Sequence, residues 1–158
     1  MYLLPVGYPL GFTLNEKYNI ERLKSDPIQL CAEELELWIS LFSSSEAIKR
    51  NELCDRLLSM GVALAYDEKS ELFGKIGQLY SFRSGIGWFA REKMCIAKDE
   101  KLFYLTKLQH EIWLKSNGYL ETQEIYSQLC GENKNEDSVD GFCEAIIYLV
   151  KNELVNLL

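Results

Sequence analysis

The chain has 158 residues, of which 47% are hydrophobic and 26% are charged, and its formal net charge is −7. This length suits one domain or two small ones, and each half lies near the lower limit for an independent core. The acidic balance disfavours nucleic acid as a partner, because phosphate binding requires clustered Lys and Arg. No apolar run reaches the roughly 18 residues of a membrane span. The N-terminus lacks the basic start of a signal peptide, so we expect a cytoplasmic protein with no membrane partner.

Five cysteines and one histidine limit the metal and redox chemistry of the chain. No two cysteines form a Cys-x-x-Cys pair, and four of them lie beside apolar residues in periodic segments. This pattern favours buried free thiols over a zinc site or a disulfide framework. There is also no nucleophile elbow, phosphate-binding loop, dinucleotide fingerprint or His-Glu-x-x-His motif. We therefore expect a protein that is not an enzyme, with no catalytic residue, no metal ligand and no cofactor.

The first part of the chain is expected to be extended and then helical. Prolines and glycines alternate with short apolar stretches in residues 1–30, which is typical of edge strands and turns. Helices are predicted over 32–42, 46–50 and 51–60, with a cluster of serines as the turn between the first two. The apolar stretch 62–66 then follows as a closing strand.

The middle of the chain is predicted to be a helical connector followed by strands. Residues 67–82 are amphipathic at helical spacing. Residues 84–90 return to an extended pattern, and the aromatic pair Trp88 and Phe89 is a candidate partner contact, because aromatics on an unpaired edge are costly unless covered. The segments 94–97 and 102–105, separated by a charged turn, indicate a hairpin.

Residues 105–119 combine the clearest local signals in the chain. Thr106 and Gln109 form a capping box at a helix N-terminus. Leu108, Ile112 and Leu114 are expected on the apolar face with Trp113 on its flank, and His110 is expected at the surface or flank. Asn117-Gly118 is predicted to stop the helix, because both residues tolerate the left-handed conformation.

The remainder of the chain is predicted to hold two more helices. One is expected over 121–130 and the other over 139–152, joined by the polar segment 131–138, for which we expect a mobile loop. Residues 154–158 close the second half in the way that 62–66 closes the first.

The order of these elements indicates an internal repeat. Aligning Trp38 with Trp113 gives an offset of 75 (113 − 38 = 75) and also pairs Cys31 with Thr106. A similar offset pairs Gly11 with Gly87 (87 − 11 = 76). We therefore predict an α+β protein of tandem winged-helix-like units, each with short N-terminal strands and a three-helix bundle. The predicted boundaries are 1–66 for the first unit, 67–82 for a helical connector and 83–158 for the second unit.

The second unit carries a recognisable pattern of strand ends, helix positions and turns. It consists of Leu105-Thr106, Ile112-Trp113, Asn117-Gly118-Tyr119, Glu124-Ile125, and Phe142 with Ile146 and Leu149. With these residues, the stretch from Ser84 to Leu158 resembles the PqqD-like peptide-binding modules, also called RiPP recognition elements. The resemblance covers about half of the chain, and the first half departs from it by lacking the Asn-Gly turn.

The resemblance implies a non-catalytic adaptor that binds a peptide by strand addition. The partner would be a leader peptide or a partner enzyme in bacterial peptide modification. A homodimer is a further expected association. In such modules main-chain hydrogen bonds supply affinity and alternate side-chain pockets supply specificity. The implied contacts are the strand Leu102, Phe103, Tyr104 and Leu105 and the helix face of Phe142, Ile146 and Val150.

The main alternative is a winged-helix DNA-binding transcriptional regulator. Its recognition helices would be 51–60 and 139–152. The first carries only Arg56, with Arg50 just before it, and the second carries only Lys151. Base reading and phosphate contacts need more positive and amide side chains than these helices offer. A small enzyme with a scattered site and a purely structural partner of a larger protein are further alternatives.

Overall fold

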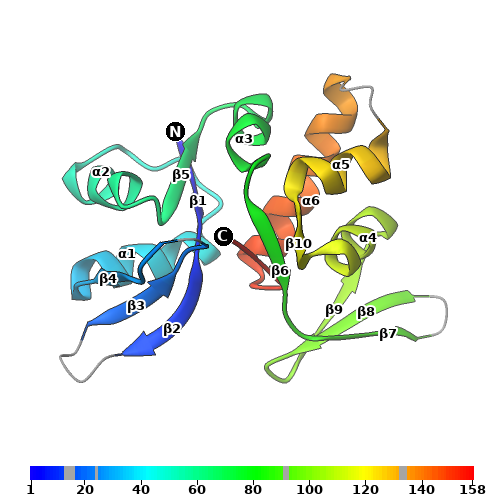
Figure 1. Ribbon diagram of the computed structural model, residues 1–158, viewed down its shortest axis with the longest axis horizontal. Coiled ribbons are helices and arrows are strands. Elements are labelled where there is room, and N and C mark those ends of the chain that lie inside the picture. Colours follow the sequence, from blue (N-terminus) through cyan, green and yellow to red (C-terminus); the bar gives the residue numbers. More distant parts are fainter. Residues whose placement is uncertain (13–16, 24, 91–92, 132–134) are drawn as a thin grey trace.

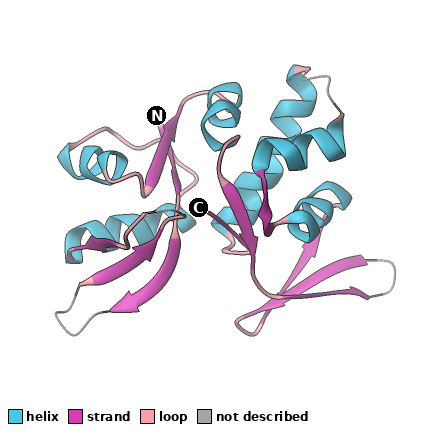
Figure 2. Cartoon of the chain, viewed as in Figure 1, coloured by secondary structure: helices cyan, strands magenta, loops and turns pink. Residues whose placement is uncertain are grey.

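Helices and small antiparallel sheets make up this computed structural model, which describes residues 1–158 except 13–16, 24, 91–92 and 132–134 (Figure 1). Within that part of the chain there are six helices and eleven strands, and the strands form four separate sheets (Figure 2). The predicted α+β class is therefore confirmed. None of the described helices is both long and apolar enough to cross a membrane.

The first half of the chain, residues 1–66, builds two sheets and two helices. Strand β1 (Tyr2–Pro5) pairs with β5 (Ala63–Tyr66), so the start and the end of this half lie side by side. Between them come a three-stranded meander and two helices: β2 (Tyr8–Phe12), β3 (Tyr18–Glu21), β4 (Ile28–Leu30), α1 (Ala32–Ser43) and α2 (Glu52–Ser59).

The second half, residues 67–158, repeats this order with additions. Helix α3 (Lys69–Ile76) leads to β6 (Tyr80–Arg83), which pairs with both β10 (Asn117–Glu121) and the final strand β11 (Val155–Leu157). The other elements are β7 (Ile86–Ala90), β8 (Lys93–Lys98), β9 (Lys101–Leu105), α4 (Lys107–Lys115), α5 (Thr122–Cys130) and α6 (Glu136–Lys151). The two meanders lie at the same end of the molecule, below the helices in Figure 1.

A glycine with a left-handed backbone precedes each meander. Gly7 has φ +109° and Gly85 has φ +88°. A Cβ on Gly7 would overlap Ile20 Cγ2, and one on Gly85 would lie 2.6 Å from Ile96 Cγ2, so both turns require the absence of a side chain. The repeated pair is therefore Gly7 and Gly85, which corrects the predicted pairing of Gly11 with Gly87.

In each half, a buried tryptophan on the helix after the meander, α1 or α4, donates hydrogen bonds to backbone near the turn glycine. The Trp38 indole Nε1 donates to the carbonyls of Val62 (2.9 Å) and Val6 (3.4 Å), and the Trp113 Nε1 donates to the carbonyl of Ser84 (2.9 Å). Val6 and Ser84 both directly precede the turn glycine. Each of the two tryptophans therefore contacts the residue before the turn glycine of its own half.

The helix caps and the closing strands also correspond. The backbone N–H of Cys31 donates to Glu34 Oε2 and that of Thr106 donates to Gln109 Oε1, each at 2.9 Å. The predicted capping box at Thr106 is confirmed. At the closing strands, the N–H of Val6 donates to the Val62 carbonyl and that of Ser84 to the Leu154 carbonyl, also at 2.9 Å each.

Three predicted elements differ from the structure in the connections between helices. Residues 46–50 form no helix. Five residues offer too few hydrogen bonds to offset helix nucleation, and the N–H of Ile48 instead donates to the Met1 carbonyl at 2.9 Å. The helix expected over 67–82 ends at Ile76, because glycines weaken its C-terminal part and residues 80–83 pair as β6. Helix α6 begins at Glu136 rather than at 139, with Asn135 as its cap; residues 132–134 of the expected loop lie outside the described part.

The turn predicted at Asn117-Gly118-Tyr119 is instead the start of β10. Gly118 does adopt a left-handed backbone, at φ +81°, but the reason is tertiary. The Phe82 ring occupies the space that a side chain at this position would need. The helix itself ends at Lys115, before the predicted stop.

Helix α6 is the centre of the larger hydrophobic core. It packs against α3 and α4 of its own half and against α1 and β1 of the first half. Leu4, Val6 and Tyr66 from the first half belong to this core. A smaller core around Ile20, Trp38 and other residues lies within the first half. The two halves therefore share buried surface.

Candidate functional site

The outer face of the second meander is apolar and exposed. The strand register places Ile86, Ala97 and Leu102 in one cross-strand row and Trp88, Cys95 and Tyr104 in the next. Side chains directly opposite each other on neighbouring strands point to the same face. Ile86 is 74% exposed and Tyr104 58%, while Leu102 and Trp88 are each more than two-fifths exposed. We call Ile86, Trp88, Leu102 and Tyr104 the outer-face patch.

The inner face of the same meander anchors it to the core. Ile96 is fully buried and Phe103 is packed against the larger cluster. A Cβ on Gly87 would lie 2.7 Å from the indole of Trp113, so β7 lies directly against this ring. Because one face is held in this way, the outer-face patch has a fixed position.

Strand β9 presents a free edge beside the patch. Among the described residues, β9 pairs only with β8. The two-residue turn of Asp99 and Glu100, both with positive φ, joins Lys98 to Lys101 and confirms the predicted hairpin. Since bonded and non-bonded pairs alternate along an antiparallel ladder, the N–H and C=O groups of Leu102 and Tyr104 point away from β8. These groups can accept a further strand.

A hollow of about 430 Å³ lies at the Leu105 end of this edge. It is lined by Lys93, Met94, Tyr104, Leu105, Thr106 and Lys107. The Lys93 ammonium lies 5.4 Å from the centroid of the Tyr104 ring, within the range of a cation–π contact. The hollow thus places a positive group next to the exposed aromatic residue of β9.

The structure brings together only part of the predicted peptide-binding set. Leu102 and Tyr104 are exposed on the edge strand, while Phe103 and Leu105 are half-buried beneath it. Phe142, Ile146 and Val150 are 0%, 0% and 1% exposed. The prediction that these three form an accessible helix face is corrected, because α6 is covered on several sides.

Two residues of the outer-face patch were missed or only partly recognised from the sequence. Trp88 was a candidate partner contact and is exposed, whereas the side chain of Phe89 lies outside the described part. Ile86 was not predicted as a contact. The alternation of Ile86 with Trp88 and of Leu102 with Tyr104 could have identified the shared face, because a two-residue period marks one side of a sheet.

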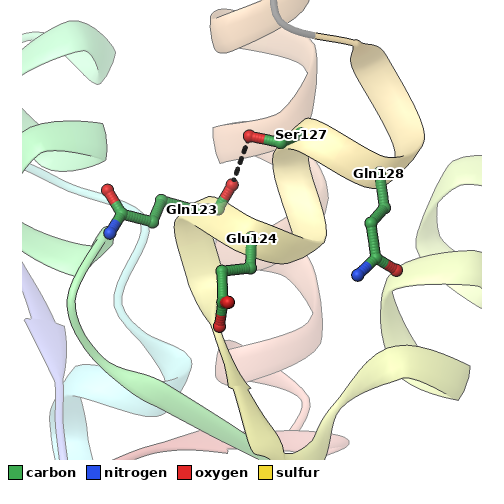
Figure 3. A pocket seen from close by; sticks show the side chains of 4 residues that line it. All are labelled: Gln123, Glu124, Ser127 and Gln128. Atoms are coloured by element: carbon green, nitrogen blue, oxygen red, sulfur yellow. Dashed lines mark hydrogen bonds between the residues drawn. The ribbon is translucent and has the colours of Figure 1, made fainter.

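A second hollow, of about 350 Å³, lies on α5 and is lined by Gln123, Glu124, Ser127 and Gln128 (Figure 3). Glu124 and Gln128 point downward from the helix in Figure 3, whereas Gln123 points to the left, and the Ser127 hydroxyl donates to the Gln123 carbonyl at 2.9 Å. Glu124 Oε2 accepts from the backbone N–H of Glu121 at 2.7 Å, and the Gln128 amide accepts from Lys115. These polar groups are committed to the fold, so the hollow offers no convergent set for a ligand.

The thiols and the histidine show no arrangement for catalysis in the described residues. All five cysteines are free; Cys54, Cys95 and Cys143 are buried and Cys31 is exposed. Burial, assisted by the nearby Asp140 carboxylate, raises the pKa of the Cys143 thiol to about 12, which removes thiolate reactivity at neutral pH. His110 is 4% exposed and stacks on Trp113, which corrects its expected surface position.

No group of three or more His, Cys, Asp or Glu side chains within the described ranges could hold a metal ion. The cationic side chains of the two candidate DNA-reading helices are engaged within the chain. Arg56 lies 3.5 Å from Glu34 and 3.9 Å from Glu33, and Arg50 lies 2.6 Å from Asp55. The Lys151 ammonium donates to the Ser44 carbonyl.

Comparison with known proteins adds no further constraint, since no protein-family model, curated protein or solved structure matches the chain.

Proposed function

We propose that the protein is a non-catalytic adaptor that binds an extended peptide or protein segment by strand addition to β9. The observation that carries the proposal is the combination of outward-pointing backbone groups at Leu102 and Tyr104 with an apolar outer face on the same strand. An added strand would satisfy those N–H and C=O groups and cover part of the exposed apolar surface. A leader peptide or a segment of a partner enzyme in bacterial peptide modification fits this mode of binding.

The proposed architecture is a tandem of winged-helix-like units. The equivalent glycine turns, tryptophan hydrogen bonds and helix caps of the two halves support it. In this interpretation the second unit holds the binding edge. The first unit has the same frame with β4 at the equivalent edge, and Gln29 at the position of Tyr104, since each lies two residues before the N-cap of the next helix.

The test is to remove one outward N–H without removing a ladder hydrogen bond. Proline lacks the N–H and is tolerated on edge strands where that group faces solvent. Peptides selected from a displayed random library against the full chain would be measured on the wild type, on Tyr104→Pro and on the matched control Gln29→Pro. We expect Tyr104→Pro to lose the selected peptides and Gln29→Pro to retain them, with both variants keeping the native circular dichroism spectrum. Equal binding to the wild type and Tyr104→Pro would refute strand addition at β9.

The DNA-binding alternative has weaker support, because Arg50 and Arg56 face carboxylates of the chain itself. Phosphate contacts would have to compete with these ion pairs. A gel-retardation assay with a mixed pool of DNA duplexes at low salt separates the two functions. Retardation that is lost in a variant with both arginines replaced by glutamine would favour DNA binding over the adaptor.

A further inference from the structure

The hollow at the Leu105 end of β9 is positively charged in a chain that is acidic overall. Its two charged lining residues are Lys93 and Lys107. Within the described part of the chain, neither ammonium lies within ion-pair distance of a carboxylate. Of the seven other described basic side chains of the second half, Lys69, Lys75 and Lys98 contact a Glu or an Asp. Arg83, Lys115 and Lys151 donate to carbonyl or amide oxygens of the chain. The hollow therefore offers positive charge to a partner from outside the chain.

The register of β9 fixes where the side chains of an added strand would lie. We consider antiparallel addition, because it pairs slightly better than parallel addition and is the arrangement of every ladder in this structure. Residues of the segment opposite Tyr104 and Leu102 would then place their side chains on the outer face, beside the patch. The residue two positions before the one opposite Tyr104 would lie next to the hollow, on the same face as Lys93.

We propose that the segment bound by β9 has the pattern acidic-x-apolar-x-apolar from its N-terminal to its C-terminal side, where x is any residue. This inference rests on the proposed function and adds the chemistry and the direction of the ligand. The carboxylate would lie between Lys93 and Lys107, and the apolar side chains would lie next to Tyr104 and Leu102. A nucleic acid could satisfy the lysines, but it has no main-chain amides to pair with the outward N–H and C=O groups of β9.

Three synthetic peptides test the inference on the full chain. The first contains Asp-Thr-Ile-Thr-Val, the second replaces its Asp with Asn, and the third has the order reversed, Val-Thr-Ile-Thr-Asp. Binding is followed by the amide resonances of Leu102 and Tyr104 and by fluorescence anisotropy. We expect the first peptide to bind about three- to tenfold more tightly than the other two at low ionic strength, and the advantage to shrink in high salt.

Two variants assign the effect to the hollow. In Lys93→Gln/Lys107→Gln the preference for the acidic peptide should disappear. Lys101→Gln, at the opposite end of the same strand, is the matched control and should keep the preference. Loss of the preference in the control but not in the double variant would overturn the placement of the carboxylate.

The outcomes separate this inference from the proposed function. If all three peptides shift the Leu102 and Tyr104 amides with equal affinity, strand addition stands and the acidic, directional preference is refuted. If no peptide shifts these amides at about 1 mM, and library selection also yields no binder to the edge, both proposals fail.

Discussion

The two meanders of this protein have the same frame and different outer faces. In each, a left-handed glycine starts the meander, a buried tryptophan bonds to the residue before it, and a capped helix follows. On the outer face, the second meander places Cys95 opposite Tyr104, where the first places Asn19 opposite Gln29. The first meander is therefore polar at this cross-strand pair, where the second is apolar, although its strand β2 also exposes Tyr8, Leu10 and Phe12.

This difference shows which positions the fold constrains. The inner residues and the turn glycines must fit the core and the backbone, so they correspond in both halves. The exposed outer residues are not constrained by core packing, so they can differ between the two halves without changing the shared backbone arrangement. An exposed Tyr104 where the equivalent edge position holds Gln29 is better explained by a contact with a partner than by folding.

The largest effect is expected at the turn glycines. Gly7→Ala and Gly85→Ala should each lower the free energy of unfolding by about 3 kcal/mol, because a left-handed alanine is strained and its Cβ overlaps an isoleucine. Gly11→Ala is the control: Gly11 has φ +100° but no atom within 4 Å of the added Cβ, so about 1 kcal/mol is expected. Urea unfolding measures all three. Equal losses at Gly11 and Gly85 would remove the special role of the repeated turns.

An intermediate effect is expected at the tryptophans. Trp113→Phe removes the indole donor of the Ser84 carbonyl, and Trp38→Phe removes that of the Val6 carbonyl and one of the two donors of the Val62 carbonyl. Each change should cost about 1–3 kcal/mol. Trp88→Phe alters the outer face, where the change should stay within about 0.5 kcal/mol. Thermal and urea unfolding of the three variants compare the stability cost at the two buried tryptophans with the cost at the exposed Trp88. A cost at Trp88 as large as that at Trp113 would mean that the outer face also supports the fold.

Exchanging the outer-face residues should have the smallest effect on stability and a clear effect on the exposed apolar surface. Tyr104→Gln and Gln29→Tyr give each meander the residue of the other, and each should change the free energy of unfolding by less than about 1 kcal/mol. Binding of a hydrophobic fluorescent dye should fall in the first variant and rise in the second. Unchanged dye binding in both would show that the outer-face patch is not the main apolar surface of the protein.

Local signals in the sequence predicted the local structure well. The capping box at Thr106 and the hairpin between Lys98 and Lys101 depend on residues within a few positions of one another, and both are present. Trp38 and Trp113, which the sequence aligns, are both buried and both donate from the indole N–H to a backbone carbonyl.

The errors arise where tertiary packing decides. β10 was predicted as a turn because the need for Gly118 comes from the Phe82 ring, far away in sequence. Leu114 was expected in the core but is 41% exposed, while Trp113 and His110 are buried, so the helix is rotated relative to the predicted apolar face. The helical spacing of Phe142, Ile146 and Val150 predicts that they face inward, and they are buried. The accessible contact face was implied only by the resemblance, and the elements packed on α6 cover it.

The shared core has a consequence for synthesis on the ribosome. Leu4 and Val6 are synthesised well before α6, yet they pack in the core around α6, and the N–H of Gly7 donates to the Leu157 carbonyl at 2.7 Å. The nascent chain can assemble the smaller cluster around Trp38 early. The apolar side of β1 must then wait until α6 and β11 have been translated, so the native state is reached only after translation of both halves, and a chain stalled between them would expose a strand prone to aggregation.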